Sequence, residues 1–284
     1  MVLGDKKLIT ILAGGSGSVK MVRGLASHRS DINVITNVGD NYWLYGMYIC
    51  PDIDTITYGL SDLLDQDKGW GIKKDTFGFL RQMEIFGEET WFRIGDRDTA
   101  THLTRTNMLK NGKSLSDITK WMSEKFAIEI KILPITDNSV DTRIITDKGD
   151  MHLQEFWVKH RGMDEVKGIE YQGADKARAN PDAVSAIHDS NLVVIAPGNP
   201  LTSIGPMLAI KGIRKELAKK KDESDGIALE RPAQVSELAP ALAGTGRSTA
   251  GTGPGDHRCP GGCLERLRRC AHEEHAEQAR HAQS

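Results

Sequence analysis

The sequence predicts an α/β protein with a Rossmann-like parallel sheet, helices on both faces of that sheet and a small β-rich insertion. Three observations support this fold class. Residues 7–13 (KLITILA) form a short apolar run that ends at glycines, as a buried parallel strand does. Residues 19–27 have the apolar spacing of a helix, and residues 32–36 form a second apolar run. This order of elements favours a right-handed β-α-β crossover.

Length and composition are those of a globular protein with a sizeable core. The chain has 284 residues, 39% of them hydrophobic, and 37 basic side chains stand against 39 acidic ones. A formal net charge of −2 argues against nucleic acid as a general partner. The chain has no apolar run of membrane-spanning length, and its first apolar run leads into a glycine loop. We therefore expect a cytoplasmic protein without a membrane partner.

Helices and strands alternate along residues 1–222, which we predict to be the α/β core. Helices are expected at residues 52–64, 76–86, 98–110, 114–126, 181–190 and 212–221. The β-rich insertion spans about 129–172, with strands expected at 129–133, 142–146, 151–158 and 168–172 and a hairpin turn at 147–150. Residues 191–196 (NLVVIA) form another buried parallel strand, and residues 37–51 are expected to be a loop.

Residues 223–284 differ in composition from the core. They contain no Phe, Trp, Tyr or Lys. A segment so poor in large apolar side chains buries too little surface to offset its ordering entropy. We predict that this tail is disordered, or that it is a coding sequence read in a shifted frame near position 222. The less favoured alternative is a zinc module without paired CxxC spacing, formed by His257, Cys259, Cys263, Cys270, His272 and His275.

A glycine loop follows the first strand and opens the first helix. Free backbone N–H groups and the helix dipole attract phosphate at such a position. The loop lacks the third glycine of a dinucleotide fingerprint and the Gly-Lys-Ser/Thr end of a Walker loop, so a plain strand-to-helix turn is the alternative. We favour phosphate binding by Gly14, Gly15, Ser16, Gly17, Ser18 and Lys20.

Three aspartates follow the second strand, at the edge where open α/β sheets bind ligands. Asp40 lies in the loop after that strand, and Asp52 and Asp54 begin the next helix (PDIDT). Aspartates at a helix start can also cap the helix and complement its dipole, which would explain Asp52 alone. Three carboxylates beside a phosphate loop suit a hard cation, so we expect Mg²⁺ here and leave its ligands open at this point.

The densest polar cluster in the chain is the string GDRDTATH at residues 95–102. In a purely structural interpretation, Asp98 caps a helix and Arg97 forms an ion pair at the surface. Alternating acids and bases beside further arginines favour a site that orients a substrate or handles an anion. Its candidate residues are Asp96, Arg97, Asp98, His102 and Arg105.

A second loop at the ligand edge follows the strand at residues 191–196. Its sequence, PGNP at residues 197–200, combines two prolines and a glycine that fix the backbone. Asn199 and Ser203 could read a base or a ribose through neutral hydrogen bonds. Because the same pattern also marks an ordinary loop, it is weak evidence for a binding site by itself.

Taken in order, these motifs resemble one family, the 2-phospho-L-lactate transferases of coenzyme F420 biosynthesis. The matching strings are LAGGSGSVK, TNVGDN, CPDIDT, DKGWGIKKDTFGFL, WFRIGDRDTATHLTRTNMLKNGKSLSDIT, ILPITD, QEFWVKHRG and APGNPLTSIGPMLAIKGIR. The similarity covers roughly residues 7–221. GDRDxATH together with PDxDT is the most specific part of it.

The resemblance implies a Mg²⁺-dependent homodimer that transfers a 2-phospho-L-lactyl group from a guanosine-diphosphate-linked donor. The acceptor is 7,8-didemethyl-8-hydroxy-5-deazariboflavin (Fo), GMP is released and the product is coenzyme F420-0. In some bacterial relatives the donor carries an enolpyruvyl group instead.

The resemblance also implies roles for individual residues. Asp54 and Arg93 match residues that contact Fo, and Asp40 and Asp54 are expected to be catalytic and to hold the metal. The glycine loop with Lys20 is expected to bind the donor phosphates, and Asn199 and Ser203 the donor nucleotide. Gly198 stands where the family usually has serine, which predicts the loss of one hydroxyl contact to the donor.

Two alternatives to an active transferase are kept. A nucleotide-sugar-binding regulatory protein of related fold begins with a similar glycine loop, GGGTG, although the GDRDTATH and PDIDT strings favour the transferase. An inactive truncated homologue is the other, because the family's strand after residue 221 is not recognisable here. Loss of that strand would expose a sheet edge.

Overall fold

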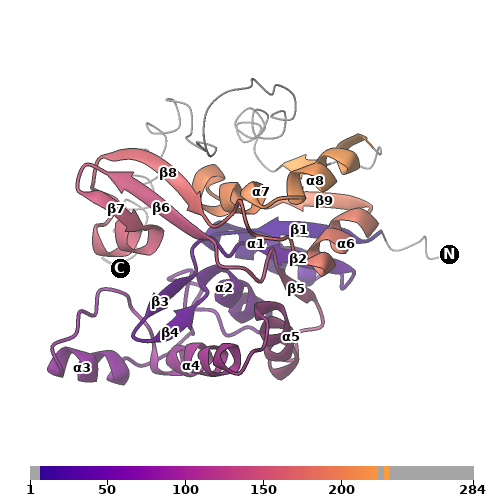
Figure 1. The fold of residues 1–284 in the computed structure, drawn as a ribbon. Coiled ribbons are helices and arrows are strands. Elements are labelled where there is room, and N and C mark those ends of the chain that lie inside the picture. The colour runs from indigo at the N-terminus through magenta and orange to yellow at the C-terminus, as the bar shows by residue number, and fades with distance from the viewer. Residues whose placement is uncertain (1–6, 223–226, 230–284) are drawn as a thin grey trace.

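A five-stranded parallel sheet forms the centre of the protein, and helices cover both of its faces (Figure 1). The computed structural model describes residues 7–222 and 227–229. The strand order is β10-β9-β1-β2-β5. The strands are β1 (Ile9–Ala13), β2 (Ile32–Thr36), β5 (Lys131–Pro134), β9 (Leu192–Ile195) and β10 (Ile227–Leu229). The predicted fold class is confirmed.

The apolar strands are buried because alternate side chains enter two separate cores. Leu12, Ile35 and Val193 belong to the core that also contains Ile187 of α6 (Pro181–Asp189) and Leu217 of α8 (Ile213–Asp222). Ile11, Val34 and Val194 point the other way, into the core formed with α1 (Ser16–Ala26) and α2 (Pro51–Leu60). This alternation explains why the strands read as continuous apolar runs.

Residues 42–49, expected to be part of a loop, form a β-hairpin instead. Its strands β3 (Tyr42–Leu44) and β4 (Met47–Ile49) pair in antiparallel register. The two turn residues, Tyr45 and Gly46, both have positive φ angles, 51° and 72°. A two-residue hairpin turn requires this conformation, but a tyrosine at its first position is not the usual sequence signal.

The β-rich insertion is a three-stranded antiparallel sheet in the order β7-β6-β8. Its strands are β6 (Asp141–Thr146), β7 (Gly149–His152) and β8 (Val166–Gln172), which enclose a small core of their own. The strand expected at residues 129–133 is β5, which pairs with β2 in the central sheet instead. The strand expected at 151–158 ends at His152 and is followed by a π-helical turn, η1 (Glu155–Lys159).

Three further helices lie where they are predicted: α3 (Gly78–Ile85), α4 (Asp96–Lys110) and α5 (Leu115–Lys125). The second π-helical turn η2 (Pro200–Ile204) and the short helix α7 (Gly205–Ala209) are not predicted from the sequence. In the residues that the structure describes, no helix is long and apolar enough to cross a membrane.

The edge of the sheet beyond β9 is covered by a strand that the sequence did not predict. Ile227–Leu229 pairs in parallel with β9, Ile227 opposite Val193. For these three residues the expectation of a bare sheet edge is wrong. The rest of the predicted tail, including its Cys and His residues, lies outside the described residues.

The crossovers that leave the neighbouring strands β1 and β9 run in opposite directions, which creates a switch point in the sheet. From β1 the chain crosses to β2 on one side, and from β9 it crosses to β10 on the other side. Loops that follow two such neighbouring strands diverge at the carboxyl end of the sheet, where open α/β proteins bind their ligands.

Candidate active site

The two loops predicted to bind the donor meet at this switch point. A Cβ atom added to Gly14 would lie 2.7 Å from the carbonyl oxygen of Ser203. One added to Gly198 would lie 2.7 Å from the carbonyl oxygen of Gly14. Glycine at both positions therefore lets the loop after β1 approach the loop after β9. The structure brings together two motifs that are far apart in the sequence.

Some side chains in and beside these loops bond within the fold, and others are exposed and could contact a ligand. Ser18 is buried, and its Oγ donates a hydrogen bond to the Gly15 carbonyl at 2.8 Å. Asn199 uses its Oδ1 to accept hydrogen bonds from the backbone N–H groups of Leu201 and Thr202, so it caps η2. Lys20 is an exposed cation in the first half of α1 without an ion-pair partner among the described residues.

Asp52 connects the glycine loop to helix α2. Its Oδ1 accepts the backbone N–H of Gly15 at 2.6 Å, and its Oδ2 accepts Asn37 Nδ2 at 3.0 Å. The same amide group of Asn37 lies 3.4 Å from Oδ1 of Asp40. Asp52 therefore holds the loop, rather than simply capping α2. Asn37 is a site residue that the sequence reasoning did not single out.

Asp40, Asp52 and Asp54 are all buried, with exposed fractions of 8%, 5% and 5%. Burial, and next the charge of Asp52, raise the pKa of Asp40 well above its usual value. Burial raises the pKa of Asp52 to about 6, although hydrogen bonds from Asn37 and Gly15 oppose the shift. The three carboxylates thus form a region in which additional positive charge would be stabilising.

Asp54 is held by an arginine behind it. Arg105 is fully buried, and both of its terminal nitrogens donate to Asp54, Nη1 at 3.1 Å from Oδ2. Nη1 also lies 3.2 Å from the Tyr48 carbonyl oxygen. A planar guanidinium that grips a carboxylate with two hydrogen bonds fixes both its position and its orientation. Arg105 is therefore a residue that positions Asp54.

His102 lies between two carboxylates on neighbouring helices. Its Nδ1 is 3.5 Å from Oδ2 of Asp54, and its Nε2 is 3.3 Å from Oδ1 of Asp98. The hydroxyl of Tyr58 donates to the same Asp98 oxygen at 2.6 Å. Although burial raises the pKa of Asp98, the hydrogen bond and charge of His102 hold it below its usual value.

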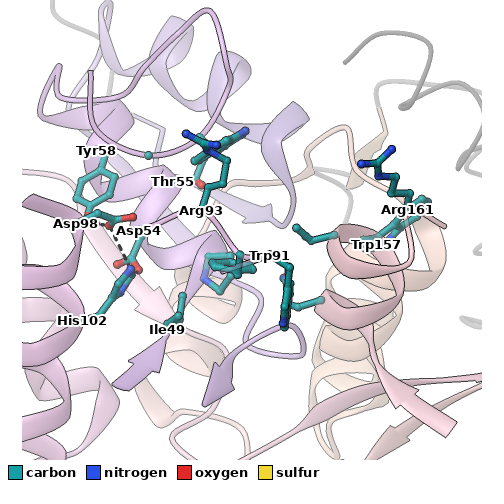
Figure 2. Close-up of a pocket in the computed structure, with 16 residues that line it drawn as sticks. Ile49, Asp54, Thr55, Tyr58, Trp91, Arg93, Asp98, His102, Trp157 and Arg161 are labelled. Atoms are coloured by element: carbon teal, nitrogen blue, oxygen red, sulfur yellow. Dashed lines mark hydrogen bonds and ion pairs between the residues drawn. The ribbon is translucent and has the colours of Figure 1, made fainter. Parts of the chain in front are cut away.

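These side chains form one side of a cavity of about 430 Å³ (Figure 2). This volume lies within the range of ~300–1,000 Å³ that is common for small-molecule sites. Asp54, Tyr58, Asp98 and His102 supply its polar side. Large aromatic side chains from separate segments also line it: Trp70, Trp91, Phe92 and Trp157. Arg93, Gln154 and Arg161 also line it.

Two of the predicted residues in the GDRDTATH string line the cavity, and two others bond to neighbouring backbone groups instead. Asp98 and His102 line the cavity, with Arg105 behind them. Asp96 does not, because its carboxylate accepts the backbone N–H groups of Gly78 and Phe79 at 2.9 and 2.7 Å and so caps α3. Arg97 also lies outside the cavity lining and donates to the Lys73 carbonyl at 3.4 Å.

Sequence reasoning missed the tryptophans of the cavity. Trp70, Trp91 and Trp157 stand in the strings DKGWG, TWFRIG and EFWVKH, beside charged residues and, for Trp70, between glycines. Large aromatic side chains outside the regular apolar periodicity were the available signal. They were overlooked because the three segments lie far apart in the chain.

A switch point in a parallel sheet beside an aromatic cavity is the arrangement of an α/β enzyme that acts on a small molecule. The family model for 2-phospho-L-lactate transferase CofD matches residues 9–227. The chain belongs to this family.

Curated relatives agree with that assignment. The chain is 39% identical over 213 residues to the 2-phospho-L-lactate transferase of Methanosarcina mazei, covering 74% of this chain and 70% of that protein. It is 37% identical over 227 residues to the phosphoenolpyruvate transferase of Mycolicibacterium smegmatis, covering 74% and 69%. Both relatives are named as transferases.

A solved structure shares the fold at low sequence identity. A crystal structure of a member of the UPF0052 family from Bacillus halodurans aligns with a TM-score of 0.53 and 19% identity. The alignment covers 75% of this chain and 66% of that one, just under two thirds of its length. This likeness concerns the architecture alone.

Proposed function

We propose that the protein transfers a 2-phospho-L-lactyl group, or its enolpyruvyl counterpart, from a guanosine-diphosphate-linked donor to the terminal hydroxyl of Fo. The hydroxyl oxygen forms a bond to the phosphorus that carries the lactate or enolpyruvate oxygen. The bond from that phosphorus to the oxygen of the GMP phosphate breaks, and the hydroxyl proton passes to a base or to solvent. The products are GMP and coenzyme F420-0. The names of the archaeal and mycobacterial relatives support one donor each.

The observation that supports this proposal best is the connection between the two halves of the site. Asp52 is bonded to Gly15 of the donor loop, and Asp54, two residues further along α2, lines the aromatic cavity. A donor on the loop and an acceptor in the cavity would therefore meet at the start of α2. Bringing two reactants together in this way removes much of the entropic barrier to their reaction.

On the donor side, the glycine loop, the start of α1 and Lys20 would bind the diphosphate. The exposed Ser16 and Gly17 stand at the first turn of α1, where helix N–H groups favour anions. Ser203 and the remaining amide nitrogen of Asn199 would approach the nucleotide. Lys20 would stabilise the charge that develops on the departing GMP phosphate.

On the acceptor side, Asp54 would orient the Fo hydroxyl or accept its proton. Arg105 holds the carboxylate in one orientation, as hydroxyl alignment requires. The tryptophans of the cavity offer flat apolar surfaces for the deazaflavin ring, and Arg93 is the further residue expected to contact it.

The carboxylates fit Mg²⁺ when substrate phosphates complete its shell. In the part of the chain that the structure describes, no three His, Cys, Asp or Glu side chains form a metal site by themselves. The Asp40 oxygens lie 3.4 Å from Asn37 and 3.5 Å from Gln154, whereas both Asp54 oxygens contact the Arg105 guanidinium. Asp40 would thus be the principal ligand, with Asp54 beside it. The ion would neutralise phosphate charge during transfer.

The proposal includes a cytoplasmic homodimer that requires neither nucleic acid nor membrane. Light scattering of the purified protein measures the oligomeric state.

Release of GMP from the guanylylated donor tests the activity, with Fo and MgCl₂ each omitted in turn. The transferase proposal requires GMP release that depends on Fo. A regulatory nucleotide-sugar-binding protein would be stabilised by GDP in thermal unfolding without any turnover, whereas an inactive truncated homologue would show neither effect.

A further inference from the structure

The charges around the cavity are distributed unequally between its two sides. Figure 2 shows Asp54, Asp98 and His102 on one side and Trp157 with Arg161 on the opposite side. On the first side each carboxylate has a basic partner, Arg105 for Asp54 and His102 for Asp98. The second side carries the guanidinium of Arg161, which forms no ion pair with a carboxylate among the residues that the structure describes.

Arg161 has no ion pair among residues 7–222. It stands two residues after the π-helical turn that carries Trp157, and a hydrogen bond of 2.8 Å from Gly162 N to the Phe156 carbonyl closes that turn. The backbone of Arg161 is left-handed, with φ at 56°. The turn thus fixes the backbone of Arg161 at the rim of the cavity. Its exposed side chain lies beside the indole ring of Trp157 (Figure 2).

We propose that Arg161 binds the ionised 8-hydroxyl oxygen of the Fo ring. This assignment rests on the proposed function. The reacting hydroxyl of Fo ends its ribityl chain, so the ring has to lie away from Asp54 when that hydroxyl is at Asp54. In Figure 2, Trp91 and Trp157 lie on the way from Asp54 to Arg161, so a ring held against them would extend toward the guanidinium.

The chemistry of the ring suits a guanidinium partner. Deprotonation of the 8-hydroxyl gives an anion that is conjugated with the ring carbonyl groups, so this hydroxyl is more acidic than an ordinary phenol. A guanidinium donates to such an oxygen in the plane of the ring and stabilises its negative charge. Binding by Arg161 therefore selects the anionic form of the acceptor.

The donor carboxylate is a less suitable partner for Arg161. It is attached to the carbon that bears the phosphate ester oxygen, so it has to stay close to the attacked phosphorus. That phosphorus belongs at the Asp54 side of the cavity, opposite Arg161. The same guanidinium cannot serve a group at that end of the site.

The optical absorption of Fo tests the assignment, because the spectrum changes when the 8-hydroxyl ionises. The pKa of bound Fo is measured in the wild-type protein, Arg161→Gln, Arg161→Lys and Arg178→Gln. Arg178 is an exposed arginine outside the cavity lining and serves as the matched control. The titratable and charged side chains that face the cavity are Asp54, Tyr58, Arg93, Asp98, His102 and Arg161. Only position 161 among them differs between the four proteins.

We expect the wild-type protein and Arg178→Gln to lower the pKa of bound Fo relative to free Fo. Arg161→Gln should lose most of this shift and bind the Fo anion about tenfold more weakly, while its affinity for neutral Fo stays the same. Arg161→Lys should retain part of the shift.

Two results would overturn the assignment. The first is an unchanged pKa and affinity in Arg161→Gln; the second is a raised KM for the donor with an unaltered Fo titration, which would assign Arg161 to the donor carboxylate. Absence of Fo binding to the wild-type protein would instead overturn the proposed function, and this assignment with it.

Discussion

Replacement of Arg105 by methionine is predicted to destabilise the fold strongly. The Arg105 side chain is 0% exposed and that of Asp54 is 8% exposed, so the substitution leaves a buried carboxylate without its partner. Removal of one member of such a buried ion pair costs about 3–5 kcal/mol. This is a large part of the ~5–15 kcal/mol that stabilises a typical domain.

Urea unfolding at neutral pH measures this cost for Arg105→Met, Asp54→Asn and the double variant. The double variant should be destabilised by less than the sum of the single variants, because it leaves no unpaired buried charge. An Arg105→Met cost below about 1 kcal/mol, or strictly additive costs, would refute the reasoning. The same data show how much of any activity lost in Asp54→Asn comes from unfolding rather than chemistry.

Three further predictions concern the segments that support the cavity. Asp96→Ala should lower the thermal unfolding midpoint, because α3 loses its cap, with the KM for Fo unchanged; a raised KM with normal stability would contradict this role. Gly95→Ala should cost about 1–3 kcal/mol in urea unfolding, since its Cβ would lie 2.2 Å from an Asp75 oxygen; a neutral effect would contradict the packing. Asp164→Asn should lower stability at pH 6, by an amount that shrinks as the pH falls below about 4; a difference that does not shrink in acid would contradict an ionic cause.

The pH dependence of the last variant follows from the surroundings of Asp164. Although burial raises the pKa of Asp164, ion pairs with Lys148 and His160 lower it below its usual value. A carboxylate with a lowered pKa in the folded state contributes stability above the pKa of the unfolded chain. That contribution is lost as the pH falls through the folded-state pKa.

The sheet and its ligand edge could be predicted from sequence because they depend on local signals. Apolar runs that end at glycine or at PGNP mark parallel strands, and the carboxyl ends of such strands meet at one edge. This logic correctly brought Gly14 and Ser203 together. It could not decide which sheet β5 joins, because an apolar run carries no information about its partner strand.

What the sequence does not reveal at the site are interactions between distant segments. Asp96 is predicted to orient a substrate, and in the structure its carboxylate accepts N–H groups at the start of α3, a helix that begins 18 residues earlier in the chain. Asp52 was considered as a cap of its own helix, yet it bonds Gly15. The cavity is assembled from segments as distant as Trp70 and Trp157, and only the folded chain brings them to one place.

Mass spectrometry of the products, with GMP quantified in the same sample, shows whether a donor at the switch point and Fo in the aromatic cavity react with each other. We expect Fo with an added phospholactyl or phosphoenolpyruvyl group, formed in equal amount to GMP and only when Mg²⁺ is present. GMP that accumulates while Fo keeps its original mass would exclude this reaction, because the donor would then be transferring its phosphoryl group to water.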